Sequence, residues 1–183
     1  MNENMKPVYD DLYLDTSYAK GVNSNQFDWL MGRDLKEVLT AIDFGCGTGH
    51  IVRALRKRGI DATGVDFSTS LETRDWMGDD KFVCGDVRTA DLGVKADLVV
   101  CHDVLEHLTE ADAPVALDNL AKHTGKFASI AIANHSDVWN GHELHLNNKP
   151  IGWWKPLLEE RWHVLEAESR INGWLHLFWC QAK

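Results

Sequence analysis

Short apolar runs, each closed by polar residues or glycine, recur along the chain and predict the strands of a sheet. Stretches with the spacing of amphipathic helices, 51–58 and 113–123, lie between the earlier runs. Strands that alternate with helices form crossover units, so we expect a parallel sheet with helices on both faces. The predicted strands cover residues 38–44, 62–66, 81–84, 98–101, 127–133, 162–168 and 175–181.

The last two predicted strands are joined by a short turn that contains Asn172-Gly173. Asn-Gly is typical of tight hairpins, so the seventh strand should run antiparallel beside the sixth. Pro114 suits the first turn of the second helix, and Gly125 suits its end. The expected fold is therefore α/β: a Rossmann-like, doubly wound seven-stranded sheet, mostly parallel, with an antiparallel last strand.

The size and charge of the chain exclude several classes of protein. Its 183 residues are enough for one domain with a sizeable core. The sequence contains no run of about 18 apolar residues, so we expect no membrane span. The formal net charge is -9, and the longest basic cluster, residues 53–58, lies on a predicted helix. A nucleic-acid partner is disfavoured, because such binding depends on basic residues that neutralise phosphates.

The cysteines indicate a reducing environment. They are widely spaced, without the pairing typical of metal sites, and no secretory leader precedes them. We therefore expect reduced thiols in a cytoplasmic protein, whose oligomeric state the sequence leaves open. The four residues are Cys46, Cys84, Cys101 and Cys180.

The turn after the first predicted strand carries three alternating glycines, Gly45, Gly47 and Gly49. Without Cβ atoms on this side of the turn, a flat ligand can lie against bare backbone. A phosphate-binding turn has a glycine where this chain has His50, and Asp43 places a negative charge where a pyrophosphate would lie. The turn therefore favours a cationic or zwitterionic ligand over a dinucleotide.

The pattern Asp-x-Gly-x-Gly-x-Gly resembles the cofactor loop of class I S-adenosylmethionine-dependent methyltransferases. Three further features match this family in the same order: an acid that ends the second strand, an acid after the third, and the segment 96–108. The resemblance covers residues 38–108 and implies S-adenosylmethionine as the cofactor. A terminal antiparallel hairpin on a parallel sheet is also a feature of this family.

The resemblance implies a role at each part of the cofactor. Asp43 lies near the methionine end, Asp66 accepts hydrogen bonds from the ribose hydroxyls, and Asp86 with Val87 meets the adenine. The residues implied at the cofactor are Asp43, Gly45, Gly47, Gly49, Asp66, Phe67, Asp86, Val87 and His102.

Residues 1–37 precede the first predicted strand and are rich in aromatic side chains, with a short helix expected at 23–32. In similar enzymes this segment covers the cofactor and helps to enclose the acceptor. We therefore expect an N-terminal cap at 1–37 and a methyltransferase domain at 38–183, although these aromatics could equally pack on the sheet edge. Tyr13 and Tyr18 are the candidates for contact with the acceptor.

The segment after the fourth strand limits the acceptor. It reads His102-Asp103-Val104-Leu105, without the two-proline box that holds an extruded base in amino-directed DNA methyltransferases. No Pro-Cys pair offers a nucleophile for cytosine. Methylation of a DNA base is therefore disfavoured.

Asp103, Glu106 and His107 have the spacing of one helical face if a helix begins near Asp103. Two carboxylates beside an imidazole suit a divalent cation such as Mg²⁺, or Zn²⁺ or Mn²⁺ if another histidine joins them. The element resembles that of two metal-dependent groups, the O-methyltransferases of quinone biosynthesis and the small-RNA 3′-terminal 2′-O-methyltransferases. Both resemblances imply a further histidine after the fifth strand, where His142 and His145 lie. The candidate metal ligands are Asp103, Glu106, His107 and His145.

Two interpretations without a metal stay open. Glu106 and His107 could bond only to nearby backbone, while Asp103 faces the amino-acid end of the cofactor. Alternatively, a histidine near its free pKa can act as a general base. The candidates for this catalytic role are His107, His142 and His145.

Several aromatic residues are candidates for the acceptor pocket. His135 follows the fifth strand at the carboxyl edge of the sheet, where ligands of open α/β sheets bind, but it could equally have no role. Trp153 and Trp154 are adjacent on a predicted helix, so one of them should reach the acceptor side or an interface. Trp139 is another candidate for an exposed aromatic. Flat indole walls suit a ring-shaped acceptor such as a phenol, sugar or nucleoside.

Together these patterns favour a cytoplasmic methyltransferase that modifies a hydroxyl oxygen of a small molecule. Because the cofactor carries the reactive methyl group, the protein mainly orients the acceptor and excludes water. One alternative is methylation of the 3′-terminal 2′-hydroxyl of RNA, which the metal-like element favours and the net charge disfavours. Another is a non-catalytic subunit that binds the cofactor or a partner.

Overall fold

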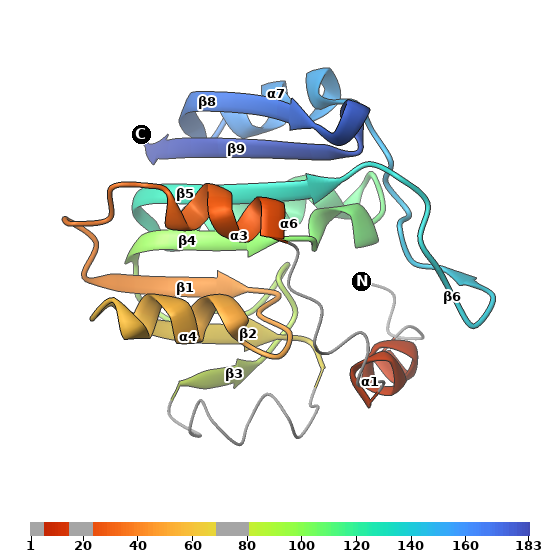
Figure 1. Cartoon of the computed structure of the whole chain (residues 1–183), viewed down its shortest axis with the longest axis horizontal. Helices are drawn as coiled ribbons and strands as arrows, with labels where there is room; N and C mark the ends of the chain where they lie inside the picture. Colours follow the sequence, from red (N-terminus) through yellow and green to blue (C-terminus); the bar gives the residue numbers. More distant parts are fainter. Residues whose placement is uncertain (1–5, 15–23, 69–80) are drawn as a thin grey trace.

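The computed structural model describes residues 6–14, 24–68 and 81–183. Within these residues, one sheet of seven strands has the order β3-β2-β1-β4-β5-β9-β8 (Figure 1). The sheet contains β1 (Thr40–Phe44), β2 (Asp61–Asp66), β3 (Phe82–Cys84), β4 (Ala96–His102), β5 (Thr124–Ala133), β8 (Trp162–Arg170) and β9 (Leu175–Ala182). Each predicted strand is present.

The strand directions confirm the predicted fold class. Strands β3, β2, β1, β4 and β5 are parallel, and β9 is antiparallel to both of its neighbours, β5 and β8. The short 3₁₀ helix η3 (Ile171–Gly173) joins β8 to β9 at the predicted Asn-Gly pair. The chain therefore folds as a doubly wound, mostly parallel sheet with an antiparallel last strand.

Helices cover both faces of this sheet (Figure 1). Side chains of α3 and α4 pack into one core cluster, and side chains of α6 and α7 pack into the other. Strand β4 contributes to both clusters, which explains why its sequence is a continuous apolar run rather than an alternating one. The helices are α1 (Lys6–Leu14), α3 (Ser24–Met31), α4 (His50–Lys57), α6 (Asp112–His123) and α7 (Ile151–Glu159).

The junction between α6 and β5 differs from the prediction. Pro114 lies in the first turn of α6 as expected, but Gly125 does not end that helix. The strand begins directly at Thr124, and a Cβ on Gly125 would lie 2.7 Å from the carbonyl oxygen of Ala96. The glycine is needed for the close approach of β5 to β4, rather than as a helix cap.

A second hairpin follows β5 and was not predicted. Strands β6 (Val138–Trp139) and β7 (His142–Glu143) pair antiparallel around Asn140 and Gly141. Both turn residues have positive φ, 47° and 80°, as a two-residue turn of type I′ requires. This hairpin extends away from the sheet toward α1 (Figure 1).

Helix α1 docks on this extension. Tyr9 and Leu12 of α1 form a small buried cluster with Leu144, and Trp139 packs against it. The division into a cap at 1–37 and a domain at 38–183 stays a prediction. Among the helices of the described part of the chain, none has both the length and the apolar character needed to cross a bilayer.

Candidate active site

The glycine turn between β1 and α4 has the backbone that its sequence requires. Gly45, Gly47 and Gly49 have positive φ values of 77°, 51° and 74°. A Cβ on Gly45 would also lie 2.1 Å from Cγ2 of Val104, in the segment after β4. Conformation and space both demand glycine at position 45. Gly49 precedes α4 and turns the chain into that helix.

Asp66 ends β2 and fastens this turn. One carboxylate oxygen accepts a hydrogen bond from the backbone N–H of Gly47 at 2.8 Å, and the other accepts from the N–H of Ser68 at 2.8 Å. Burial raises the pKa of Asp66 to about 6, although these two amide bonds lower it. Each carboxylate oxygen can accept a further hydrogen bond, so the predicted contact with a diol is compatible with this role.

Asp43 lies under the turn and is almost completely buried, with 2% of its surface exposed. Burial raises the pKa of Asp43 to about 8, and the nearby Asp66 carboxylate adds to the effect. A buried acid with such a pKa gains from a neighbouring positive charge. This agrees with the prediction of a cationic ligand above the turn.

A cavity with about 550 Å³ of empty space, part of it open to solvent, lies at the carboxyl edge of the sheet. Of the predicted cofactor residues, Gly45, Asp66, Phe67, Asp86 and Val87 line it. The residues from the segment after β4 are also at its wall. The complete lining is Tyr9, Gly45, Asp66, Phe67, Gly85, Asp86, Val87, Asp103, Val104 and His107.

Asp86 is paired within the protein. Its Oδ2 lies 2.6 Å from the Arg88 guanidinium, which also lies 3.1 Å from Asp112. The guanidinium lowers the pKa of Asp86 despite partial burial, so the carboxylate is ionised at neutral pH. This pairing was not expected from the sequence, and it fixes the orientation of the carboxylate at the cavity wall.

His102 does not face the cavity with its ring. Its Nε2 lies 2.9 Å from the hydroxyl of Ser129 on β5, and burial lowers the pKa of His102 to about 3. The other ring nitrogen, Nδ1, is buried without a hydrogen-bond partner in the described part of the chain. Of the predicted cofactor contacts, Asp43, Gly47, Gly49 and His102 lie outside the cavity lining.

No helix begins at Asp103, so the condition for a helical face shared with Glu106 and His107 is not met. Asp103 has a φ of 55°, and the chain forms only the 3₁₀ helix η2 (Leu105–His107). The carboxylate of Asp103 accepts hydrogen bonds from Nε2 of Gln26 at 2.6 and 2.8 Å. Burial raises its pKa to about 6, and the bonds from Gln26 lower it. Asp103 therefore does not share a helical face with Glu106 and His107.

Glu106 and His107 nevertheless meet His145 from the segment after β7. One potential ligand atom from each of the three side chains lies within 4.8 Å of the others. Glu106 is fully buried; its Oε1 accepts a hydrogen bond from the N–H of Ala133 at 3.0 Å. Its Oε2 is buried without a partner among the described residues. Of the four predicted metal ligands, this group contains Glu106, His107 and His145 but not Asp103.

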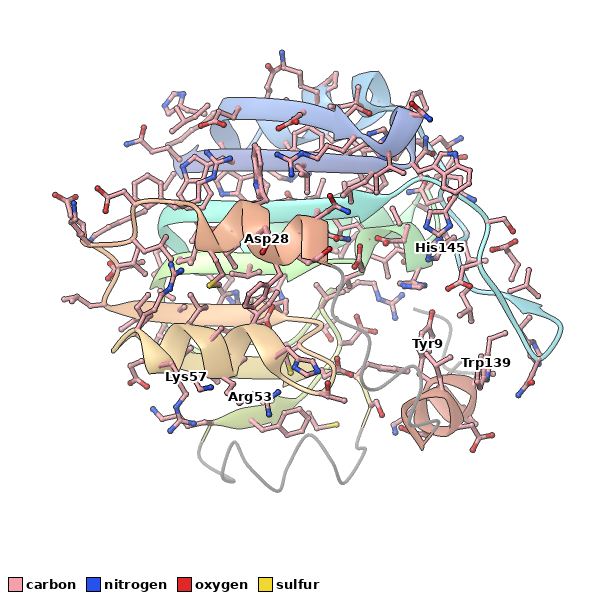
Figure 2. All side chains as sticks on the ribbon, in the orientation of Figure 1. Tyr9, Asp28, Arg53, Lys57, Trp139 and His145 are labelled. Atoms are coloured by element: carbon pink, nitrogen blue, oxygen red, sulfur yellow. The ribbon has the colours of Figure 1, made fainter. Side chains whose placement is uncertain are left out.

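Both imidazoles of this group are oriented through Nδ1. His145 Nδ1 lies 2.6 Å from the carbonyl oxygen of His135, and His107 Nδ1 lies 2.9 Å from that of Leu144. A carbonyl only accepts, so each Nδ1 carries the proton and each Nε2 has a lone pair. Tyr9 places its hydroxyl 2.9 Å from Nδ1 of His107. Figure 2 shows Tyr9 and His145 together at this edge of the sheet.

Burial sets the protonation of this group. It lowers the pKa of His107 to about 4, with a contribution from His145, and it lowers the pKa of His145. It also raises the pKa of Glu106 well above its usual range, and Asp103 adds to that rise. Two neutral imidazoles beside a carboxyl group with an unpaired oxygen can bind a cation or accept a proton.

Residues 10–177 match the family model described as a methyltransferase domain. The chain belongs to this family. It is a member of the class I S-adenosylmethionine-dependent methyltransferases, and the strand order and glycine turn agree with that membership.

Two relatives with curated names share about a quarter or less of their aligned residues with this chain. A malonyl-[acyl-carrier protein] O-methyltransferase of Anoxybacillus flavithermus is 26% identical over 63% of this chain and 46% of its own length. A ubiquinone biosynthesis O-methyltransferase of Rhodopseudomonas palustris is 22% identical over 94% of this chain and 70% of its own length. The chain thus spans less than half the length of the malonyl-[acyl-carrier protein] enzymes that it matches.

A solved structure has the same fold. The N-methyltransferase NodS from Bradyrhizobium japonicum, in complex with S-adenosyl-L-homocysteine, has a TM-score of 0.74 and 14% identity. It covers 98% of this chain and 99% of its own chain. At this identity the likeness concerns the fold.

In this methyltransferase, the other residues predicted to act as a base or to contact the acceptor are not members of the group of Glu106, His107 and His145, or lie outside the described residues. His142 is exposed on β7 and is not part of the group with Glu106. Tyr18 and the side chain of Tyr13 lie outside the described residues. Trp154 is fully buried and Trp153 packs beside it, while Trp139 is partly buried against α1, so the predicted exposure of Trp139 is wrong.

Tyr9 is the functional candidate that sequence reasoning missed. Its ring lies edge-on to His107 with 5.5 Å between centroids, and its hydroxyl contacts the same ring. In the sequence it is one of several aromatic residues of the N-terminal segment, and nothing beside it in the chain distinguishes it from the others. Because 98 residues separate Tyr9 from His107, no local spacing could have paired them.

Proposed function

We propose that this methyltransferase transfers a methyl group from S-adenosylmethionine to a hydroxyl oxygen of a small-molecule acceptor. The observation that carries this proposal is the group of Glu106, His107 and His145, because His107 also lines the cavity beside the glycine turn. A hydroxyl is a poor nucleophile unless its proton is removed, and this group offers proton acceptors at that point. The O-methyltransferase names of the curated relatives support oxygen as the methylated atom.

The residues that line the cavity and those of the adjoining glycine turn suit the cofactor at each part. A positive charge at the methionine end would lower the raised pKa of Asp43, so that its carboxylate offers negative charge there. Asp66 would accept hydrogen bonds from the ribose, and Val87 with Asp86 would meet the adenine. When bound, S-adenosylmethionine supplies an electrophilic methyl group on a sulfonium. Gly45 and Gly47 leave room for the cofactor to lie against backbone.

A divalent cation also fits the group of Glu106, His107 and His145. The unpaired Oε2 of Glu106 and the Nε2 lone pairs of the two histidines would form a mixed oxygen and nitrogen donor set, which suits Mn²⁺ or Zn²⁺, and Mg²⁺ less well. The hydrogen bonds from each Nδ1 to a carbonyl are the outer contacts that commonly orient metal-binding histidines. Such a cation would supply Lewis-acid chemistry that lowers the pKa of an acceptor hydroxyl.

The side chains can also act on the proton themselves. Nε2 of His145 would accept the proton of the acceptor hydroxyl as the oxygen attacks the methyl carbon. Asp137, whose Oδ2 lies 3.9 Å from that Nε2, would stabilise the imidazolium that forms. Tyr9 and Leu144 hold His107 beside His145, so that the rings keep their orientation.

Two measurements test the proposal. With the full chain saturated with S-adenosyl-L-homocysteine, we expect calorimetry to detect Mn²⁺ binding that Glu106→Gln and His145→Ala each weaken at least about tenfold. His163→Ala, at an exposed histidine on β8, is the matched control and should bind Mn²⁺ normally. Methyl transfer from labelled S-adenosylmethionine to hydroxylated small molecules should fall in the same two variants.

Three outcomes would contradict the role of the group, the role of the cation and the class of acceptor, in that order. If transfer proceeds unchanged in Glu106→Gln and His145→Ala, this group does not activate the acceptor. If Mn²⁺ does not bind but His145→Ala abolishes transfer, the histidine acts without a cation. If the label enters only an RNA 3′ end, the acceptor is not a small molecule.

A further inference from the structure

Trp174 is an exposed indole beside the candidate active site. It follows η3 at the tip of the β8–β9 hairpin, and 58% of its surface is exposed. By contrast, Trp29, Trp154, Trp162 and Trp179 are buried. A single exposed apolar side chain needs no explanation in itself, so the case depends on how Trp174 is held and on what lies next to it.

The hairpin tip is fastened to the end of β5. The side-chain amide of Asn134 donates a hydrogen bond to the carbonyl oxygen of Gly173 at 2.9 Å, and its backbone N–H donates to that of Trp174 at 2.7 Å. Figure 1 shows the turn between β8 and β9 at the same edge of the sheet as the carboxyl ends of β4 and β5. Trp174 therefore has a fixed position at the edge where ligands of open α/β sheets bind.

The backbone at the tip of the β8–β9 hairpin is strained. Ile171, which is 49% exposed, has a φ of 53°, and Asn172 and Gly173 continue with positive φ. A β-branched residue in this left-handed region is an outlier, because its Cβ approaches the carbonyl oxygen. Strain of this kind is concentrated at ligand-binding and catalytic positions.

A row of rings connects Trp174 to the cofactor cavity. The centroid of Trp174 lies 5.7 Å from that of His135, which is itself exposed. His135 lies 4.9 Å from His145, and His145 lies 4.8 Å from His107 at the cavity wall. The planes of Trp174 and His135 are inclined by 44°, so a flat molecule stacked on the indole would meet the imidazole of His135 at an angle and have one end toward His145.

We propose that Trp174 and His135 form a platform for a hydroxylated ring, whose flat, apolar face stacks on the indole while the inclined imidazole of His135 contacts the edge of the ring, with the hydroxyl directed toward His145. This inference rests on the proposed function and adds the class of acceptor. Indole and imidazole faces bind planar rings by offset or tilted stacking. Asp137 and Glu143 lie close to His145, so a strongly anionic acceptor would meet like charge there. The platform therefore suits a neutral ring.

The test follows Trp174 directly in the full chain. The protein is labelled with 5-fluorotryptophan and saturated with S-adenosyl-L-homocysteine, and the ¹⁹F resonance of Trp174 is assigned from Trp174→Phe. Catechol is the probe, and cyclohexane-1,2-diol, which has the same two hydroxyls without a flat face, is its control. We expect catechol to shift the Trp174 resonance saturably and cyclohexane-1,2-diol to leave it unchanged.

Variants complete the test. Trp174→Ala should weaken catechol binding about tenfold, whereas Leu165→Ala, at another exposed apolar position on the hairpin, should not change it. The proposal is overturned if catechol leaves the Trp174 resonance unmoved, if the diol shifts it equally, or if Trp174→Ala binds catechol as well as the parent chain. Near-ultraviolet circular dichroism establishes that each variant is folded.

This experiment separates the two proposals. The titration follows binding and needs no methyl transfer, so a saturable shift without any methylated product would leave the platform standing and remove the proposed chemistry. If catechol is methylated but the Trp174 resonance does not move, the proposed chemistry stands and the platform is removed.

Discussion

At the residue scale, the raised pKa of Asp43 affects both the stability of the fold and the binding of a cationic ligand. The carboxyl group of Asp43 is buried close to Asp66 and to the thiols of Cys46 and Cys101, and burial together with the Asp66 carboxylate raises its pKa. Its pKa of about 8 lies far above the value of about 3.9 for an unfolded chain. Between these values the folded protein holds a proton that the unfolded chain has lost, so stability falls as pH rises.

Asp43→Asn should therefore flatten the dependence of stability on pH. We expect the free energy of unfolding, from urea denaturation without cofactor, to fall less between pH 5 and pH 8 in this variant. The difference should be at most about 1.4 kcal/mol per pH unit. Asp97→Asn is the control, because the backbone N–H of Leu39 donates a hydrogen bond to Asp97 and lowers its pKa. The stability lost in Asp97→Asn should therefore be the same across this pH range. Equal slopes in the Asp43→Asn variant and the parent would refute the prediction.

At the scale of elements, the β1–α4 turn and the segment after β4 are fitted to each other. Gly45→Ala combines strain at positive φ with a clash against Val104. Gly59→Ala, at a φ of 82° with nothing within 4 Å, has the strain alone, about 1–2 kcal/mol. Gly45→Ala should therefore lower the free energy of unfolding more than Gly59→Ala.

Val104 provides a test of the cause. In the double variant Gly45→Ala with Val104→Ala, the clash is relieved, so the loss should be smaller than the sum of the single losses by more than about 0.5 kcal/mol. Urea denaturation of the four proteins gives this coupling energy. Additive losses would mean that the two segments do not press on each other.

Elements whose pattern is local were predictable from sequence. Strands buried on both faces, such as β4, are continuous apolar runs, and Asn172-Gly173 marked the turn between β8 and β9. In the segment after β4, one shared helical face for Asp103, Glu106 and His107 requires a helix at Asp103, and spacing alone cannot reveal that the backbone of Asp103 is left-handed. The Asn140-Gly141 hairpin carried the same signal as the other turn but lacks long strands to flank it.

Side-chain contacts between distant segments of the candidate site could not be predicted from the sequence. Glu106, His107 and His145 were each named as candidates, but only folding shows that Asp103 is bound to Gln26 instead of joining them. The ring of His102 turns to Ser129, a partner on a neighbouring strand. Such pairings depend on the register of β4 against β5, which no single run of residues records.

At the scale of the whole molecule, the cofactor should stabilise the fold by mass action. S-adenosyl-L-homocysteine at a hundred times its Kd adds about 2.7 kcal/mol. For a chain of this size, Tm should then rise by roughly 5–10 °C. Asp66→Asn should lose most of this rise, and Asp61→Asn, at the exposed start of the same strand, should keep it. Thermal denaturation with and without the ligand measures both, and an unchanged rise in Asp66→Asn would contradict the role of that acid.

The position of β9 has a consequence for how the chain reaches this structure. Although it follows β8 in sequence, β9 lies between β5 and β8 in the sheet. Until β9 arrives, the outer edge of β5 stays open, with unpaired amides that invite pairing with another chain. Within the part of the chain that the structure describes, β8 pairs with β9 alone, so β8 cannot shield this edge. Completion of the sheet, and protection from aggregation during synthesis, therefore wait for a single strand to be inserted.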